Sequence, residues 1–298
     1  MPDARRARGL GETLGEAVRE VQRVLAQAGV DDPGRDARLL VAAAAGVETS
    51  QIIARPEWRL SIEAQARLQD MVLRRSAREP VSRIVGEREF YGRRFSLSPA
   101  TLDPRPDSET LIEAALAISA REGWRETPIR ILDIGTGTGC LLLTLLGELP
   151  LATGLGTDVS EAALATAARN AETLGLARRA TFARHDAHEG IAGSFDLVIS
   201  NPPYIHTGDI ADLSPEVRQY DPLAALDGGP DGLDIYRKIA AGLERVLRGW
   251  VILEVGMGQA DAVAQLLQQA FVKTRKAEVC RYDDLGGHTR CVALRLQS

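Results

Sequence analysis

The 298-residue chain has few of the residues that hold small secreted or metal-binding proteins together. Its three cysteines, Cys140, Cys280 and Cys291, lie far apart in the sequence. Such a set forms neither a disulfide framework nor a group of zinc ligands, and the four histidines show no metal-ligand spacing. We therefore expect no metal site, a reducing cytoplasmic environment, and cysteines that pack as small buried side chains.

Long apolar runs are also missing. No stretch reaches about 18 uninterrupted apolar residues, which argues against a membrane-spanning helix. The first ten residues, MPDARRARGL, are basic but contain no apolar core, so we expect no secretory signal. A hydrophobic content of 45% with 26% charged residues is typical of a globular protein.

An overall excess of basic charge is absent, because the net charge is −5. Residues 1–95 contain 17 arginines, no lysine and 14 acidic residues, for a net charge of +3, whereas residues 96–298 carry −8. A protein that binds free nucleic acid is usually far more basic. We interpret the arginine-rich part as a solvated helical surface, with contact to a nucleic acid or an anionic particle as the alternative.

The arginine-rich part shows helical periodicity. Apolar residues from Leu14 to Ala28 recur every three or four positions, which predicts a helix over residues 13–28 that ends at Gly29. Similar signals predict helices over 33–45 and 61–78. We expect a small all-α domain over 1–85 that takes part in substrate docking, then a hairpin linker over 86–105.

Residues 106–298 are predicted to form an α/β domain. A helix is expected from Pro106 to about residue 120, with Asp107 or Ser108 as its cap. Strands and helices then alternate, which indicates a mostly parallel, Rossmann-like sheet with helices on both faces. The last two extended runs are joined by a loop too short for a crossover, so they should form an antiparallel hairpin. The predicted strands are 129–135, 153–159, 180–186, 195–201, 250–256, 276–283 and 290–297, and the helices are 139–149, 160–174, 232–247 and 259–271.

A glycine-rich loop follows the first strand of this domain, in the sequence ILDIGTGTGCLLL. Gly135, Gly137 and Gly139 allow a tight turn and a close approach of backbone N–H groups to a ligand. The G-x-G-x-G spacing differs from that of dinucleotide binders, and Asp133 just before the loop would repel a pyrophosphate. This carboxylate suits an ammonium group instead. The loop residues that we expect to bind the ligand are Gly135, Thr136, Gly137, Thr138 and Gly139.

Two further acids end the next two strands. Asp158 is placed to accept from the two hydroxyls of a ribose, and Asp186 to accept from an adenine amine, with Ala187 beside it. An amino acid end, a ribose and an adenine without a phosphate describe S-adenosylmethionine, whose methylation product is S-adenosylhomocysteine. The sequence therefore predicts a class I methyltransferase that uses this cofactor.

The segment VISNPPYIH, residues 198–206, leaves the sheet beside this pocket. Asn201 offers a side-chain carbonyl oxygen, and Pro203 holds Pro202 extended, so that the Pro202 carbonyl has a fixed direction. Two such acceptors match the two hydrogens of a planar –NH₂ group, and Tyr204 can stack on that plane. We expect Asn201, Pro202 and Tyr204 to be catalytic, with Pro203 also binding substrate and Asn201 also next to the cofactor.

At this point the sequence resembles the protein-(glutamine-N5) methyltransferases of peptide-chain release factors, the PrmC/HemK family. The resemblance lies in PVSRIVGEREFYGRRFSLSPATLDPRPDSETL at 80–111, LDIGTGTG, SNPPYI, LEVG at 253–256 and DLGGHTRCV at 284–292. The chain departs from the family pattern at Asp103, where an aliphatic residue is common, and at Ala187, which is smaller than usual. Arg105 and Glu109 are interpreted either as a capped helix start with a surface ion pair or as site residues.

The resemblance implies methylation of the glutamine in the Gly-Gly-Gln loop of class I release factors, with Asn201 and Pro202 holding the amide and Tyr204 beside it. We expect a cytoplasmic monomer with no stably bound nucleic acid and no membrane partner. The long connection over 205–231 is expected to contribute to substrate binding. Two alternatives stay open: an adenine-N6 nucleic-acid methyltransferase, and a non-catalytic ribosome-associated binding module.

Overall fold

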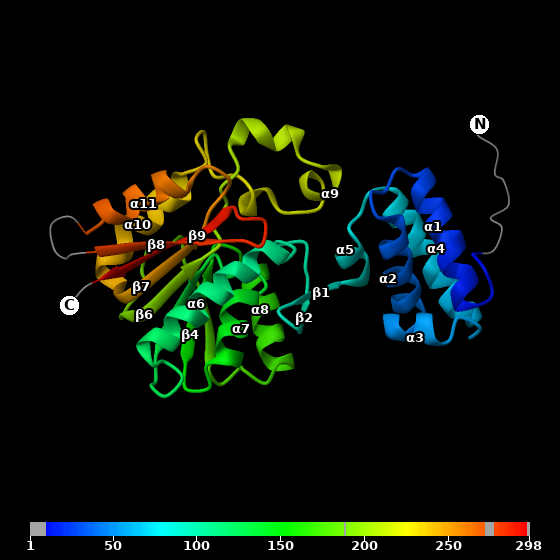
Figure 1. Ribbon diagram of the computed structural model, residues 1–298, viewed down its shortest axis with the longest axis horizontal. Helices are drawn as coiled ribbons and strands as arrows, with labels where there is room; N and C mark the ends of the chain where they lie inside the picture. Colours follow the sequence, from blue (N-terminus) through cyan, green and yellow to red (C-terminus); the bar gives the residue numbers. More distant parts are fainter. Residues whose placement is uncertain (1–9, 188, 272–276, 297–298) are drawn as a thin grey trace. The chain divides into compact units, whose positions relative to one another are not determined.

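The computed structural model describes residues 10–187, 189–271 and 277–296 (Figure 1). The start of the predicted helical domain and the outermost positions of the predicted terminal strands, 276 and 297, lie outside the described residues. The chain divides into two compact units, Met1–Gly86 and Glu87–Ser298. Among the described residues, no helix combines the length and the apolar character needed to cross a membrane.

The regular elements of the first unit are helices over the residues that the structure describes, 10–86. Thr13 and Glu16 form a capping box at the start of its first helix, and Asp32 caps the second, which ends at Gly46 with a φ of 69°. The three predicted helices are present, and two shorter ones were missed. The helices are α1 (Leu14–Gln27), α2 (Pro33–Ala45), α3 (Thr49–Ala54), α4 (Ile62–Ser76) and α5 (Val81–Val85).

Some of the arginines in this unit serve its own structure. The Arg75 guanidinium is almost fully buried and pairs with Asp36 at 2.7 Å. Arg74 pairs with Glu79 at 2.6 Å. Part of the arginine excess therefore joins helices to one another instead of facing solvent.

The second unit begins with the predicted hairpin, formed by β1 (Glu87–Phe90) and β2 (Arg93–Ser96). Its two turn residues, Tyr91 and Gly92, both have positive φ, as a type I′ turn requires. Phe90 and Phe95 are buried and pack edge to face, with ring centroids 6.3 Å apart. The hairpin thus contributes two aromatic side chains to the core of the larger unit.

The main sheet has seven strands in the order β5-β4-β3-β6-β7-β9-β8. The first five are parallel, and β9 runs antiparallel to both β7 and β8, so the predicted terminal hairpin is confirmed. The strands are β3 (Arg130–Ile134), β4 (Thr153–Asp158), β5 (Ala180–Arg184), β6 (Phe195–Ser200), β7 (Leu247–Glu254), β8 (Ala277–Asp283) and β9 (Thr289–Leu296).

Helices cover both faces of this sheet, and each face has its own core (Figure 1). Successive strand residues show the alternation, because Ile131 packs in one core and Leu132 in the other. Helices α6 to α8 lie on the first face and α10 and α11 on the second. Their bounds are α6 (Glu109–Glu122), α7 (Cys140–Glu148), α8 (Glu161–Thr173), α10 (Asp234–Val246) and α11 (Ala260–Gln269).

Two sequence predictions need correction. The helix predicted from Pro106 begins as a short 3₁₀ turn, η1 (Pro106–Ser108), and neither Asp107 nor Ser108 caps it or α6 through its side chain. Of the three cysteines, Cys291 is buried, but Cys140 and Cys280 are only partly buried.

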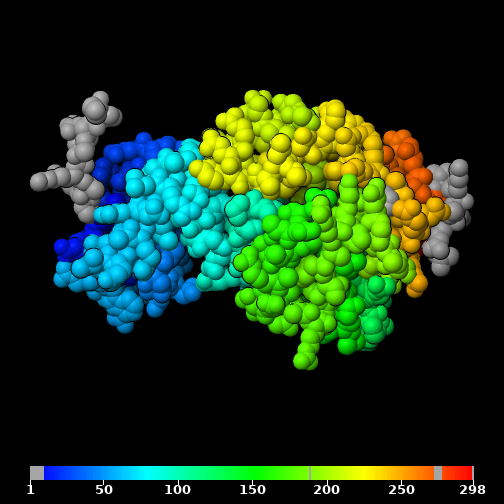
Figure 2. All heavy atoms as spheres, turned by 180° about the vertical axis from the view of Figure 1, so that it is seen from behind, coloured from blue at the N-terminus to red at the C-terminus, as the bar shows by residue number. Residues whose placement is uncertain are grey.

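The long connection after β6 has structure of its own. It contains η2 (Thr207–Asp212), the single-turn helix α9 (Pro215–Arg218) and η3 (Leu223–Ala225). Its two ends are joined where the Ile205 N–H donates to the Leu226 carbonyl at 3.0 Å and the Gly228 N–H to the Ile205 carbonyl at 2.8 Å. In Figure 2 this segment, coloured yellow-green to yellow, forms a layer along one side of the larger unit.

Candidate active site

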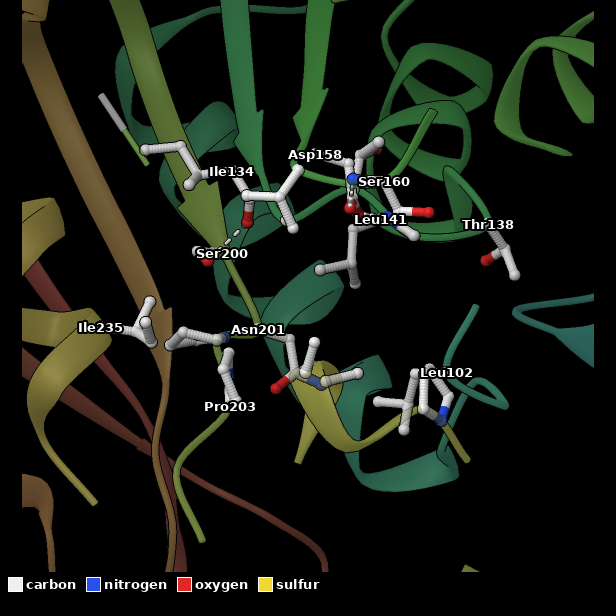
Figure 3. A pocket seen from close by; sticks show the side chains of 18 of the residues that line it. Leu102, Ile134, Thr138, Leu141, Asp158, Ser160, Ser200, Asn201, Pro203 and Ile235 are labelled. Atoms are coloured by element: carbon white, nitrogen blue, oxygen red, sulfur yellow. Dashed lines mark hydrogen bonds between the residues drawn. The ribbon is translucent and has the colours of Figure 1, made fainter. Parts of the chain in front are cut away.

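A cavity of about 390 Å³ lies at the carboxyl ends of the parallel strands. The loops after β3, β4, β5 and β6 form one part of its wall, and residues between Ala100 and Ser108, together with Pro222, Ala224 and Ala225, form another. Figure 3 shows Asn201 and Pro203 on one side of the cavity, with Leu141 and Asp158 across from them. The carboxyl edge of an open parallel sheet is where such folds bind ligands.

The glycine loop turns back over the ends of β3 and β4. The N–H groups of Gly135 and Thr136 both donate to the Thr157 carbonyl at 2.8 Å, and all three loop glycines have positive φ. Gly135, Thr136, Gly137 and Thr138 line the cavity, but Gly139 does not. A Cβ on Gly139 would lie 3.0 Å from Leu143, so this glycine serves the close packing of α7.

Asp133 lies beneath the loop instead of on the cavity wall. Its side chain is fully buried, and Oδ2 accepts a hydrogen bond from the Thr136 hydroxyl at 2.7 Å. Oδ1 is buried and has no hydrogen-bond partner among the described residues. Burial raises the pKa of Asp133 to about 7. An orphaned buried acceptor is costly and fits a site where a donor from a ligand completes it.

Asp158 lines the cavity as predicted and is held by backbone groups. Its Oδ2 accepts from the Gly137 N–H at 3.0 Å, and its Oδ1 accepts from the Ser160 N–H at 2.9 Å. Each carboxylate oxygen has a second lone pair for a further donor. The glycine loop and the start of α8 therefore fix this carboxylate in place beside the cavity.

Asp186 and Ala187 line the cavity after β5. The Asp186 carboxylate is about half exposed and pairs with Lys238 of α10 at 2.9 Å. Ala187 is buried and adopts a φ of +51°, a left-handed conformation that is uncommon for a residue with a side chain. An amine that approached Asp186 would share its carboxylate with Lys238.

Residues 201–204, called the acceptor segment below, follow β6 directly. The Ser200 hydroxyl donates to the Ile134 carbonyl at 2.6 Å, which ties the ends of β6 and β3 together (Figure 3). Asn201, Pro202 and Pro203 line the cavity.

Tyr204 does not line the cavity. Its ring packs over Gly256, where an added Cβ would lie 3.0 Å from Tyr204 Cδ2, and its carbonyl accepts from the Gln259 side chain at 2.9 Å. Burial raises the pKa of Tyr204 to about 12.

Sequence reasoning missed two residues behind Asn201. The Asn201 amide donates from Nδ2 to the Ser108 hydroxyl at 3.0 Å. The Glu254 side chain is buried at the end of β7, and its Oε2 has no hydrogen-bond partner among the described residues. The available signal was the acid in LEVG, because a carboxylate at the end of a buried strand is costly to bury.

Residues 100–108 and 222–225 form one wall of the cavity, called the roof below. Polar contacts of the segment 97–110 hold this wall in place. Arg105 pairs with Asp221 at 2.5 Å, and the Asp103 N–H donates to the same carboxylate at 3.3 Å. Glu109 accepts from the Tyr91 N–H at 3.0 Å. Arg105 thus lines the cavity and joins residues 100–108 to the connection after β6, whereas Glu109 anchors the hairpin turn.

Comparison with known proteins shows which family this sequence belongs to. Residues 16–86 match the PrmC N-terminal domain, and residues 119–216 match the methyltransferase small domain. A release factor glutamine methyltransferase of Rhodospirillum rubrum is 46% identical over 90% of this chain and 80% of its own length. One of Cereibacter sphaeroides is 45% identical over 94% of this chain and 98% of its own. The chain belongs to the release factor glutamine methyltransferase family.

A solved structure agrees on the fold. The catalytic domain of hMettl16, in complex with an RNA hairpin of the MAT2A 3′UTR, has a TM-score of 0.53 and 16% identity, and the match covers 77% of this chain and 79% of that one. At this identity the likeness is one of architecture alone. The larger unit of this release factor glutamine methyltransferase family member is thus a Rossmann-like methyltransferase fold.

Proposed function

We propose that this methyltransferase transfers the methyl group of S-adenosylmethionine to the side-chain amide nitrogen, N5, of the glutamine in the Gly-Gly-Gln loop of class I release factors. One observation carries the proposal: Asn201 lines the cavity beside the glycine loop while its amide nitrogen is engaged by Ser108. Its carbonyl oxygen therefore remains available to a substrate.

The residues around the glycine loop fit the proposed cofactor. The Oδ1 of Asp133, buried beneath the glycine loop, lacks a donor among the described residues, Asp158 has free lone pairs at the cavity, and Gly135 to Thr138 line the cavity. We assign Asp133 to the ammonium group, Asp158 to the ribose and Asp186 with Ala187 to the adenine. Bound there, the cofactor supplies an electrophilic methyl group on a sulfonium.

The acceptor segment answers a chemical difficulty. An amide nitrogen is a poor nucleophile because its lone pair is delocalised into the carbonyl. Oxygen acceptors from Asn201 and Pro202 that hold its two hydrogens favour electron density on nitrogen and fix its position, so catalysis is mainly positioning and electrostatics. We assign no general base, because the nitrogen becomes strongly acidic after methyl transfer and loses its proton readily.

Tyr204 needs a revised role within this proposal. Its ring packs over Gly256, and its carbonyl is held by Gln259. We propose that it supports the acceptor segment from behind, and that it reaches the substrate only at the edge of the cavity.

We further propose that the helical unit docks the release factor, that the protein acts as a monomer, and that it works in the cytoplasm, where translation takes place. The adenine-N6 alternative requires the chain to hold a polyanion, and a net charge of −5 disfavours this. A non-catalytic module would have no need of the cavity or of the ordered Asn201.

A single assay separates these functions. The full chain is incubated with methyl-labelled S-adenosylmethionine and offered a class I release factor, the same factor with the loop glutamine changed to alanine, or duplex DNA. We expect label only on the unmodified release factor. Label on DNA would support the adenine alternative, and no label on any substrate would support the binding module. Asn201→Ala provides the control for contaminating activity.

A further inference from the structure

His185 stands between the two strand ends whose acids are assigned to the nucleoside of the cofactor. It follows β5 directly, and its backbone N–H donates to the carbonyl of Asp158, the last residue of β4, at 3.1 Å. His185, Asp158 and Asp186 all line the cavity. The proposed function gives each acid a role and leaves the imidazole without one.

One contact fixes which nitrogen of the His185 ring carries a hydrogen. Nδ1 lies 2.7 Å from the carbonyl oxygen of Glu189. A carbonyl oxygen can only accept, so the hydrogen must be on Nδ1. In the neutral ring, Nε2 then carries no hydrogen and offers a lone pair. The contact with Glu189 therefore makes the other ring nitrogen a hydrogen-bond acceptor.

The packing of the ring shows which of its sides faces away from the cavity. A Cβ added at Gly190 would lie 3.3 Å from His185 Nδ1 and 3.4 Å from Cε1, so this side of the ring packs over the glycine. Neither Glu189 nor Gly190 lines the cavity, whereas His185 does. The Nδ1 side of the ring thus lies behind the cavity wall, which leaves Nε2 as the ring nitrogen that can serve a ligand in the cavity.

Adenine presents a donor that needs more than one acceptor. Its exocyclic amine is the only hydrogen-bond donor of the base in a nucleoside, and it directs its two hydrogens apart. The carboxylate of Asp186 is already engaged, because Lys238 Nζ lies 2.9 Å from one of its oxygens and 3.3 Å from the other. Asp186 can accept one amine hydrogen beside this cation, and the second hydrogen requires another acceptor.

We propose that His185 is a specificity-determining residue, which accepts the second amine hydrogen of adenine at Nε2. The proposal rests on the proposed function, which places adenine beside Asp186. It makes the pocket selective for a 6-amino purine, because a 6-oxo purine would turn an acceptor oxygen toward the two acceptors Asp186 and His185.

Binding of two ligands to the full chain tests the proposal without any turnover. S-adenosylhomocysteine carries the amine, and S-inosylhomocysteine has an oxygen in its place. Calorimetry at pH 8 gives a Kd for each ligand, and the ratio of the two values is the amine preference of the protein. We expect the wild-type protein to prefer S-adenosylhomocysteine by ~10–100-fold, because a site built of acceptors rejects an analogue that lacks the donor.

Two substitutions of His185 separate its two ring nitrogens. In His185→Asn the amide nitrogen can occupy the place of Nδ1 and still donate to Glu189, but no atom replaces Nε2. The amine preference should fall by ~5–10-fold in this variant, with the affinity for S-inosylhomocysteine little changed. In His185→Gln the amide oxygen can reach the place of Nε2, so most of the preference should remain.

His288→Asn is the matched control, because it makes the same chemical change in the exposed loop between β8 and β9. Both Kd values should stay at the wild-type level in this variant. A wild-type amine preference in His185→Asn would overturn the proposal. So would an equal loss of affinity for both ligands, or a preference that is lost in His185→Gln and kept in His185→Asn, since each of these results assigns the residue a structural role alone.

The same measurements distinguish this proposal from the proposed function. If the wild-type protein methylates a release factor and His185→Asn keeps the full amine preference, the proposed function stands and the role of His185 is wrong. If the wild-type protein binds neither ligand, the assignment of the cavity to S-adenosylmethionine is wrong, and the role of His185 is wrong with it.

Discussion

The two halves of the cavity are built by different means. The half proposed to bind the cofactor, around β3 and β4 and called the cofactor half below, is shaped by backbone: glycines with positive φ and N–H groups that hold Asp158. The half proposed to bind the acceptor amide, called the acceptor half, is shaped by side chains from distant parts of the chain, since Asn201 follows β6 and donates to Ser108 of η1. Backbone resists single substitutions, whereas a side-chain hydrogen bond depends on both partners.

The largest effect should come from the acceptor half. Asn201→Ala removes a preorganised acceptor that acts on the reacting nitrogen, so kcat should fall by ~100–1000-fold while binding of S-adenosylmethionine stays close to wild type. Rapid-quench methylation assays and calorimetry of cofactor binding measure the two quantities. If Asn201→Ala keeps the wild-type kcat, side chains of the acceptor half do not control turnover and the contrast between the two halves is wrong.

In the cofactor half the effect should appear in affinity. Asp158→Ala removes the carboxylate assigned to the ribose and also the acceptor for the Gly137 N–H. We expect KM for S-adenosylmethionine to rise by ~10–100-fold, with a smaller change in kcat. Asp158→Asn should recover part of the affinity because its oxygen still accepts. A loss confined to kcat would contradict this assignment.

The roof joins the two halves and should have a moderate effect. Arg105→Ala breaks the ion pair with Asp221, whose side chain is only 2% exposed, and loosens residues 100–108 from the connection after β6. KM for both substrates should rise by ~2–10-fold. Arg105→Lys keeps the charge and should lose less. Steady-state kinetics with each substrate varied would measure both KM values. Unchanged values would show that the Arg105–Asp221 ion pair is not needed to hold the roof in place.

The smallest effect concerns stability. The pKa of Asp133 is raised to about 7 by burial, so the folded protein retains a proton that the unfolded chain releases above its ordinary value of 3.8. This group therefore reduces stability as the pH rises from about 4 to 7, and the reduction persists above pH 7. Asp133→Asn cannot ionise, so its Tm relative to wild type should increase over that range by a few degrees, roughly 2–6 °C.

Differential scanning calorimetry at pH 4.5 and pH 8 tests this last prediction. Thr136→Val removes the hydroxyl that donates to Asp133, so the pKa of the Asp133 carboxyl should rise further in this variant. If Tm depends on pH in the same way in Asp133→Asn and in wild type, the pKa of the Asp133 carboxyl is not raised by folding.

The sequence predicted most of the fold because the signals were local. Glycines at helix ends, alternating apolar runs and the short last loop placed the helices and strands of the sheet within a few residues. The short helices α3 and α5 were missed, since five or six residues show too little periodicity.

The positions of Gly135, Asp158 and Asp186 on the cavity wall were equally predictable, because each residue lies next to the end of a strand. The packing of the Tyr204 ring could not be predicted, because it depends on Gly256, 52 positions later, which no local pattern reveals. The contact between Ser108 and Asn201 stayed hidden for the same reason, because the two residues are 93 positions apart.

One buried side chain links the cofactor half to the start of the larger unit. Asn170 of α8 donates to the Thr138 carbonyl at 2.9 Å and to the Ser96 carbonyl at 3.1 Å, and it accepts from the Ser96 N–H at 2.9 Å. The hairpin follows Gly86 directly, where the helical unit ends. One amide side chain of α8 therefore fixes both the glycine loop and the end of the hairpin, so that replacing Asn170 would leave backbone groups at two separate places without their partners.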